Sequence, residues 1–421
     1  MAHINHIRNI DHLARLSILD VIDRSYLNSF GAFCGRQSQR NMIALHKISR
    51  IFGTIGIIIL HNDSLFENQL SQIYELNPSL STGNAPSMFI ANQVDSTGSI
   101  ISYYDPLYGL TQSAVLDVLA PRANTRSPLE INKLRAILSD YLSIMEHQFQ
   151  KNPVAFGAYP YTLDLLYDLT AMPYSELQKR VLSFLPDNLK KPISSRLSEE
   201  GSQQNAYNAV LSFAQSMKEF LWTKRSFSNH TKLSIVDIGK SRQLISIYIP
   251  ESRPDVLEYI ATELQQLNNL RIPYLVIENG LNLNASQKLK SIFMTEHNVL
   301  PYFTGILAEN TSTIIDQNNN TNDLASLFSQ VQEMFVFSCS SILAAQPFSD
   351  GIGNYYRRVE DQHNDTRREP FHIFSSHGQG NVQREITQRI VDPEELTGMT
   401  NGCLLYGKNY PIPVLVDNFI L

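Results

Sequence analysis

The stretch that decides the fold is residues 28–60, NSFGAFCGRQSQRNMIALHKISRIFGTIGIIIL. It begins with a compact apolar run that ends in a glycine-containing loop at Cys34. Apolar residues then recur at helical spacing from Met42 onwards, and Gly53 marks the end of that helix. The β-branched run that follows, ending at Leu60, is typical of a strand buried on both faces of a parallel sheet. The stretch therefore predicts a strand, a helix and a second strand, which together form a βαβ unit.

The same alternation of strands and helices occurs on both sides of a helical region. Residues 111–225 contain no β-branched runs, carry Leu, Ala and Tyr at helical spacing, and are divided by several prolines. Strand patterns return from residue 231, and 273–278 (PYLVIE) is another buried-strand run. One parallel sheet interrupted by a helical insertion explains this order. We therefore expect an α/β fold in which residues 1–110 and 226–421 form one discontinuous domain that holds an all-α domain.

Two further segments carry local predictions. Residues 232–250 read as a hairpin that turns at Gly239-Lys240. Residues 349–385 are polar and show no clear period, so we expect irregular structure there.

Composition restricts the classes of protein to consider. The chain has 421 residues, 34 Lys and Arg, 40 Asp and Glu, a net charge of −6 and a charged fraction of 18%. A globular domain usually has about a quarter of its residues charged, so the sequence excludes a disordered chain and disfavours a large basic nucleic-acid face. A low charged fraction is common where surface is hidden in an assembly.

The cysteines and the apolar runs indicate a reduced, cytoplasmic setting. Cys34, Cys339 and Cys403 are far apart, which gives neither a disulfide framework nor a zinc pattern. The N-terminus has no apolar core of a signal peptide, and the longest apolar runs are too short to span a bilayer. No cluster of His, Cys and acidic residues has ligand spacing, so we predict no metal site.

The loop after the first strand is the natural phosphate site of such a fold. A working phosphate loop reads G-x-x-x-x-G-K-[S/T], because glycines let amides face the phosphates and the lysine neutralises charge. Here Gly31 and Ser38 fit, and Gly35 lies between them. Arg36 replaces the second glycine and Gln37 replaces the lysine. We interpret this segment as a degenerate phosphate loop; the alternative is an ordinary βα turn.

A competing motif is Gly239-Lys240-Ser241, the single GKS of the chain. The spacing places Ser234 where the first glycine belongs, and a strand pattern follows Ser241. Because a phosphate loop needs a helix N-terminus, we favour the hairpin turn over a phosphate site.

Hydrolysis of a nucleotide also needs acids at the end of a buried strand. The run Tyr274-Leu275-Val276-Ile277 is such a strand, and Glu278 follows it with a carboxylate that suits a metal ion held through water. Asn279 stands where the water-activating acid belongs, and a neutral amide cannot accept a proton there. The alternative is a buried strand that ends in a surface glutamate.

Taken in order, these segments resemble the cytosolic domain of type IV coupling proteins, the TraG/TraD-type P-loop ATPases of conjugation and type IV secretion. The resemblance covers about residues 25–421 and rests on segments including FGAFCGRQSQRNMIALHKI (30–48), ISYYDPLYGL (101–110), IPYLVIENGLNL (272–283), FTGILAENTS (303–312) and REITQRIVDPEELTGMTNGCLLYGKNYPIPVLV (384–416). It implies a RecA-like P-loop NTPase fold with an inserted all-α domain. ATP and Mg²⁺ are the cofactors that it implies for the phosphate loop.

The departures from the family pattern imply a pseudo-ATPase with no catalytic residue. Gln37, Glu278, Asn279 and Glu309 stand at the positions of the family's phosphate lysine, its two strand-end acids and its sensor glutamine. We therefore hypothesise a scaffold or substrate receptor in a type IV secretion or conjugative DNA transfer system.

The family's all-α domain contacts DNA, relaxosome proteins or effectors, and the net charge of −6 favours protein contacts over tight DNA binding. The implied partners are proteins of the secretion machinery or its substrates, further copies of this chain, or an active paralogue in a mixed ring. The implied location is the cytoplasm or the inner face of the cell membrane.

Two alternatives stay open. The first is an active ATP-driven DNA or protein translocase, of the coupling-protein or FtsK/HerA-like class, in which Arg36 supplies the phosphate charge and Glu278 acts as metal ligand or base. The second is an unrelated α/β protein with a helical insertion, whose sheet would lack the RecA strand order.

Overall fold

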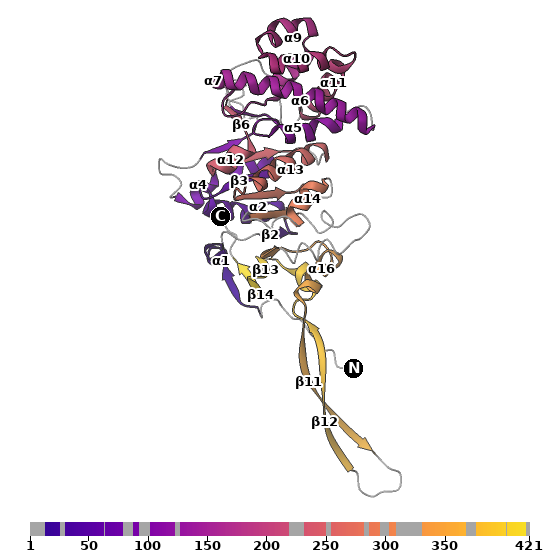
Figure 1. The fold of residues 1–421 in the computed structure, drawn as a ribbon. Helices are drawn as coiled ribbons and strands as arrows, with labels where there is room; N and C mark the ends of the chain where they lie inside the picture. The colour runs from indigo at the N-terminus through magenta and orange to yellow at the C-terminus, as the bar shows by residue number, and fades with distance from the viewer. Residues whose placement is uncertain are drawn as a thin grey trace.

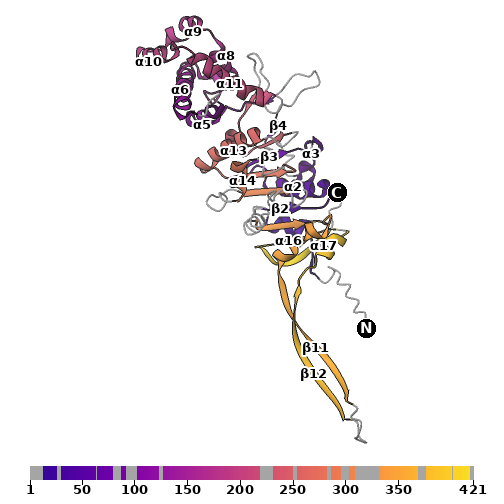
Figure 2. The same ribbon diagram turned by 90° about the vertical axis from the view of Figure 1, so that its right-hand side faces the viewer.

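The computed structural model describes the chain in thirteen segments. They are residues 13–25, 30–62, 64–78, 87–91, 102–122, 127–218, 231–249, 254–281, 286–294, 303–308, 331–367, 376–400 and 402–417. Helices gather at one end of the molecule, a sheet flanked by helices lies in the middle, and a two-stranded arm extends from the other end (Figures 1 and 2).

A ten-stranded sheet forms the centre. In sheet order its strands are β1 (Arg15–Ser17), β14 (Tyr410–Asp417), β13 (Cys403–Gly407), β10 (Glu333–Val336), β2 (Phe30–Phe33), β9 (Phe303–Ala308), β8 (Tyr274–Asn279), β3 (Gly56–His61), β7 (Leu244–Tyr248) and β4 (Met88–Ile90). Strands β10 to β4 are parallel to one another. Strand β13 pairs antiparallel with both β10 and β14, so the sheet is mixed and the expectation of a purely parallel sheet is wrong at this edge.

The order of the central strands identifies the fold. Numbered along the chain, β2, β3, β8, β9 and β10 take the order 5-1-4-3-2 across the sheet, which is the RecA-like order. Strands β7 and β4 extend the sheet beyond β3, and β13, β14 and β1 extend it beyond β10. The fold is therefore α/β and RecA-like, and the alternative of an unrelated sheet is excluded.

The buried runs predicted from the sequence form strands because both faces of the sheet are covered. In β3, Ile58 and Leu60 belong to one core cluster and Ile57 and Ile59 to the other, all with no exposed surface. The helices α2 (Gln37–Ile51), α3 (Ser64–Gln69) and α4 (Gln72–Leu76) contribute to the second cluster, whereas α13 (Pro254–Asn269) and α14 (Gln287–Met294) contribute to the first. A strand that is apolar at every position is what this arrangement requires.

Residues between 112 and 218 form a helical region, and their described part contains no strand. Its helices are α5 (Gln112–Leu119), α6 (Pro128–Lys151), α7 (Pro153–Phe156), α8 (Leu163–Ala171), α9 (Tyr174–Arg180), α10 (Asp187–Leu197) and α11 (Ser202–Lys218). Their apolar residues join those of the α13 side of the sheet in one core cluster. No helix in the described segments is long and apolar enough to cross a membrane.

The segment predicted to be irregular forms a long hairpin instead. Strands β11 (Asn354–Arg367) and β12 (Ser376–Arg389) pair antiparallel without a register shift, from Asn354↔Arg389 to Arg367↔Ser376. They project as an arm from the region of α16 (Ile342–Ile352) and α17 (Pro393–Gly398) (Figure 2). The prediction failed because the sequence NYYRRVEDQHNDTR has no apolar alternation for a strand rule to detect.

Residues 232–250 do not form the predicted hairpin. Strand β6 (Thr231–Leu233) is followed by the helix α12 (Ile235–Ser241), and β7 comes after it, so there is no hairpin. The Ser234 hydroxyl accepts hydrogen bonds from the amides of Val236 and Asp237, which begins the helix. The helix ends at Arg242, which has a φ of 57°.

Asp105 joins the helical region to the strand β5 (Ser102–Tyr104), which pairs with β6. Its side chain has no exposed surface, and it accepts hydrogen bonds from the amides of Leu107 at 2.9 Å and of Leu163 at 3.1 and 3.0 Å. Leu163 is the first residue of α8, so the carboxylate also lies at a helix N-terminus, where negative charge is favoured.

Asp105→Ala should therefore lower the free energy of unfolding by about 3 kcal/mol, because the two buried amides of Leu107 and Leu163 lose their acceptor. Urea unfolding monitored by far-UV circular dichroism measures this loss. The control is Asp117→Ala, which removes an exposed ion pair with Arg135 and should cost less than about 1 kcal/mol. Equal losses for the two variants would contradict the role given to Asp105.

Candidate functional site

The candidate site lies at the carboxyl edge of the parallel strands. In open α/β sheets ligands bind outside this edge. Strand β2 ends at Phe33, β8 at Asn279 and β10 at Val336. Register pairs place Phe33 beside Val336, and His61 beside Asn279. The residues predicted from the phosphate-loop and strand-end patterns therefore lie along one edge.

The loop between β2 and α2 is shorter than the predicted phosphate loop. Gly31 lies within β2, where it pairs with Met334 on one side and Ile306 on the other. Only Cys34, Gly35 and Arg36 separate the end of β2 from the start of α2. Residues 31–38 therefore do not form one loop: they comprise the end of a strand, a three-residue turn and the start of a helix.

The amides of this turn are bonded within the protein. The Gly35 amide donates to the Ser338 carbonyl at 3.0 Å, and the Arg36 amide donates to Gln39 Oε1 at 2.9 Å. Gly35 has a φ of 66°, and a side chain there would collide with Phe337, so only glycine fits this position. The amides of a phosphate cradle face an anion, whereas these two face partners in the chain.

Arg40 places a positive charge against the same turn. Its side chain is 1% exposed, and Nη1 donates to the carbonyl oxygens of Cys34 and Gly35 at 3.0 Å each. The turn therefore presents carbonyl oxygens to a cation of the chain itself. Arg40 lies one turn into α2 and outside the phosphate-loop pattern, so that pattern gave no sign of its role.

The other predicted loop residues lie nearer the surface. Arg36 and Ser38 are exposed, and Gln37 is half-buried. Arg36, which was considered as a substitute for the phosphate lysine, is thus the last residue before α2, and the buried cation of the turn is Arg40.

Glu278 and Asn279 end β8, and neither side chain has exposed surface. The alternative reading of Glu278 as a surface glutamate is therefore wrong. Within the described segments, neither of its carboxyl oxygens has a hydrogen-bond partner. Burial raises the pKa of Glu278 well above its ordinary value, and the nearby Leu281 amide and Arg40 guanidinium lower it by less.

Asn279 belongs to a chain of amide side chains that joins three elements. Its Nδ2 donates to Asn41 Oδ1 at 2.8 Å, and Asn41 Nδ2 donates to Gln69 Oε1 at 3.1 Å. This chain runs from β8 through α2 to α3. The arrangement gives Asn279 a structural role, and it contains no group that accepts a proton from water at neutral pH.

His61 lies next to Asn279 in a second buried polar cluster. Its Nε2 is 2.9 Å from Ser246 Oγ and 3.2 Å from Glu67 Oε1. Both partners contact the same ring nitrogen, and Ser246 has no exposed surface. A catalytic triad instead needs the serine and the acid on opposite ring nitrogens, so this cluster is a structural one.

The GKS motif lies far from this edge. Gly239, Lys240 and Ser241 end α12, so no helix N-terminus follows them. Lys240 Nζ donates to the Tyr159 hydroxyl at 3.2 Å, and that hydroxyl donates to Asp237 Oδ1 at 2.6 Å. The lysine thus helps to hold the helical region against α12.

Glu309 and a metal site were the other features considered from the sequence. Glu309 lies outside the described residues. Among those that are described, no three His, Cys, Asp or Glu residues are grouped so that they could hold a metal ion.

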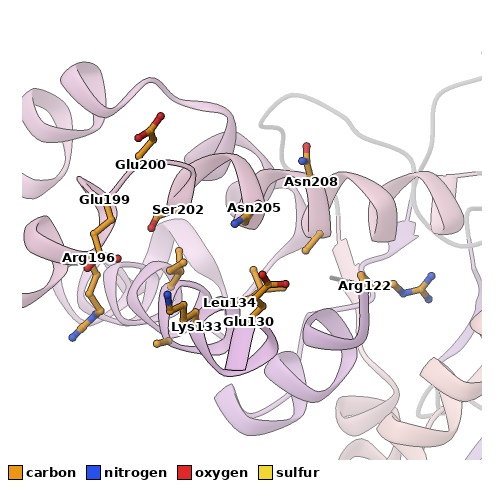
Figure 3. Close-up of a pocket in the computed structure, with 13 residues that line it drawn as sticks. Arg122, Glu130, Lys133, Leu134, Arg196, Glu199, Glu200, Ser202, Asn205 and Asn208 are labelled. Carbon is orange, nitrogen blue, oxygen red and sulfur yellow. The ribbon is translucent and has the colours of Figure 1, made fainter. Parts of the chain in front are cut away.

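A separate cavity of about 620 Å³ lies within the helical region. Figure 3 shows side chains of α6, among them Glu130 and Lys133, on one side and Asn205 and Asn208 of α11 on the other. Its lining combines acidic, basic and amide side chains with apolar ones such as Leu134. No sequence pattern predicted it, because its walls come from helices distant in the chain.

No protein-family profile matches the sequence, and no curated protein matches it. Among solved structures, the chain is similar to the bacterial conjugative coupling protein TrwBdeltaN70 in complex with sulphate, with 12% identity and a TM-score of 0.47 over 94% of this chain and 86% of that chain. It is also similar to the plasmid coupling protein TrwB in complex with ADP and Mg²⁺, with 13% identity and a TM-score of 0.44 over 94% and 86% of the two chains. VirB4 of Thermoanaerobacter pseudethanolicus is similar at 7% identity, with a TM-score of 0.44 over 93% and 89%.

The fold assignment rests on the strand order of the sheet. The chain is an α/β protein with a RecA-like sheet, and in its β2–α2 turn the amides of Gly35 and Arg36 and the carbonyls of Cys34 and Gly35 are hydrogen-bonded to other groups of the chain.

Proposed function

We propose that this chain is a catalytically inactive relative of the type IV coupling-protein ATPases. The observation that carries the proposal is the β2–α2 turn, in which the Gly35 and Arg36 amides are bonded internally and Arg40 is bonded to the turn carbonyls. A bound phosphate would have to displace these bonds, and it would gain no lysine, because Gln37 is neutral.

The strand-end residues support the same proposal. The Asn279 side chain is a neutral amide that cannot act as a base toward water, and it is already hydrogen-bonded to Asn41. Loss of both the phosphate lysine and the general base should reduce hydrolysis by many orders of magnitude. ATP and Mg²⁺ are therefore not expected as resident cofactors.

The proposed role is that of a scaffold or substrate receptor in a type IV secretion or conjugative DNA transfer system. Its support is the collinear sequence resemblance, together with a helical region that lies between β5 and β6, two strands that pair with each other beside the main sheet. We further propose the division into a RecA-like domain of residues 1–110 and 226–421 and an all-α domain of 111–225.

The proposed partners are machinery or substrate proteins, further copies of the chain, or an active paralogue in a mixed ring. The net charge of −6 makes DNA a weak partner. The proposed location is the cytoplasm or the inner face of the cell membrane.

Millimolar ATP with Mg²⁺ should leave the melting temperature of the purified protein unchanged. A nucleotide at 100 times its dissociation constant would add about 2.7 kcal/mol to the stability of the folded state. Thermal unfolding with and without ATP measures this, and phosphate release with and without DNA measures turnover. We expect no turnover above background.

The controls are Gln37→Ala and Glu278→Ala. Any residual phosphate release should be the same in the wild type and both variants, which marks it as a contaminant. Release that is abolished in either variant, together with stabilisation by ATP, would replace the proposal by the active translocase.

A further inference from the structure

Cys34 and Cys339 bring two thiols together at the carboxyl edge of the sheet. Their sulfur atoms are 3.3 Å apart, although 305 residues separate them in the chain. Cys34 follows β2 and Cys339 follows β10, which are adjacent parallel strands. Both residues are free cysteines, with exposed fractions of 2% and 4%.

The surroundings distinguish the two thiols. The Cys339 thiol donates a hydrogen bond to the Cys34 sulfur, and this bond, with a smaller contribution from Arg40, lowers the pKa of Cys34 against the effect of its burial. The same bond and burial raise the pKa of Cys339. Cys34 is therefore the more acidic of the two thiols and the one that reacts first with an oxidant, and Cys339 is the neighbouring thiol that reacts second.

We propose that Cys34 and Cys339 form an oxidisable dithiol whose co-substrate is a small peroxide and whose product is an intramolecular disulfide. The Cys34 thiolate attacks one peroxide oxygen, the O–O bond breaks, and Cys34 becomes a sulfenic acid while hydroxide leaves. The Cys339 sulfur then attacks the Cys34 sulfur, the S–O bond breaks, and water leaves as the disulfide forms. In total two thiols lose two electrons and two protons, and one hydrogen peroxide becomes two waters.

Burial selects the oxidant. Cys34 is only 2% exposed, so its oxidant must be small: hydrogen peroxide meets this condition, whereas glutathione disulfide is too large.

Oxidation would restrain the β2–α2 turn. An S–S bond is about 2.05 Å long, so the two sulfurs approach by little more than 1 Å from their present 3.3 Å. The turn already bonds to the segment after β10 through Gly35 N to Ser338 O and Phe337 N to Phe33 O. The disulfide would add a covalent link to that contact and hold the turn in the conformation described above. The inference does not depend on whether the chain binds nucleotide.

The first test uses the folded full-length protein treated with equimolar hydrogen peroxide. Free thiols, counted after denaturation, should fall from three to one, and the intact mass should fall by two hydrogen atoms. Peptide mapping should find Cys34 joined to Cys339. Cys403, which is buried and has no neighbouring thiol in the described residues, serves as the internal reference and should oxidise at least about tenfold more slowly.

The second test separates the two roles. In Cys339→Ser, a dimedone adduct should form on Cys34, whereas in Cys34→Ser no adduct should form on Cys339; Cys403→Ser should still lose two thiols. The disulfide should also raise the melting temperature of the wild type by about 5 °C, and a reductant should reverse this. Oxidation at the same rate at all three cysteines, or loss of thiols without a Cys34–Cys339 peptide, would overturn the proposal.

Discussion

Replacing Lys47 by methionine should lower the free energy of unfolding by about 3–5 kcal/mol, because the change leaves a buried carboxylate without its counter-charge. Lys47 Nζ lies 2.5 Å from Glu333 Oε2, and the two side chains are 1% and 0% exposed. The pair joins α2 to β10, the helix and the strand that flank β2. Burial lowers the pKa of Lys47, and the attraction of Glu333 opposes this.

The double variant Lys47→Met/Glu333→Met is the sharper measurement. It removes both charges, so it should recover most of the loss seen in either single variant. The matched exposed pair is Arg180–Glu176, at 2.9 Å with side chains 71% and 39% exposed, and Arg180→Met should cost no more than about 0.5 kcal/mol. Guanidinium unfolding of the wild type, the two single variants, the double variant and Arg180→Met measures these losses. Additive losses in the double variant would show that the pair is not coupled.

Glu278→Gln should change how stability depends on pH. Burial raises the pKa of Glu278 in the folded state, so between the unfolded pKa, about 4.3, and the folded pKa the folded chain holds more protons than the unfolded chain. Stability from this group is therefore full below the unfolded pKa and falls as pH rises, by up to about 1.4 kcal/mol per pH unit. Glutamine does not titrate, so its variant lacks that decline.

Urea unfolding of the wild type and of Glu278→Gln, repeated from acid to mildly alkaline pH, measures the difference in slope. The control is Glu394→Gln at an exposed position of α17, which should follow the wild type at every pH. Parallel curves for wild type and Glu278→Gln would mean that Glu278 reaches solvent or a partner in solution.

Much of the fold follows from local pattern. The runs that became β3 and β8 are apolar at almost every position, and a strand covered on both faces needs this, so the sequence identified them with their neighbours. The helix predicted from the apolar spacing after Met42, with Gly53 as its end signal, is α2, whose apolar residues pack against the sheet. Neither pattern depends on distant residues.

The site was less predictable because its partners come from distant parts of the chain. Phosphate-loop spacing located the β2–α2 turn, but a pattern of spacing does not contain the bonds from Arg40 to the turn carbonyls or from Gly35 to Ser338. Likewise the hairpin expected at Gly239-Lys240 was displaced by a helix, because Ser234 supplies a cap that outweighs the turn-forming glycine. Glu278 was placed correctly at a strand end, and its burial depends on elements that lie outside its own segment.

The position of β2 in the sheet has a consequence for biosynthesis. Both of its neighbours, β9 and β10, come much later in the chain, so they emerge from the ribosome on the order of tens of seconds after β2. The helices between 112 and 218 contact mainly one another, so they can fold in that interval, before β2 has either of its neighbours. Until β9 and β10 are made, the apolar segment of β2, α2 and β3 has unpaired strand edges, and we expect a chaperone to protect it.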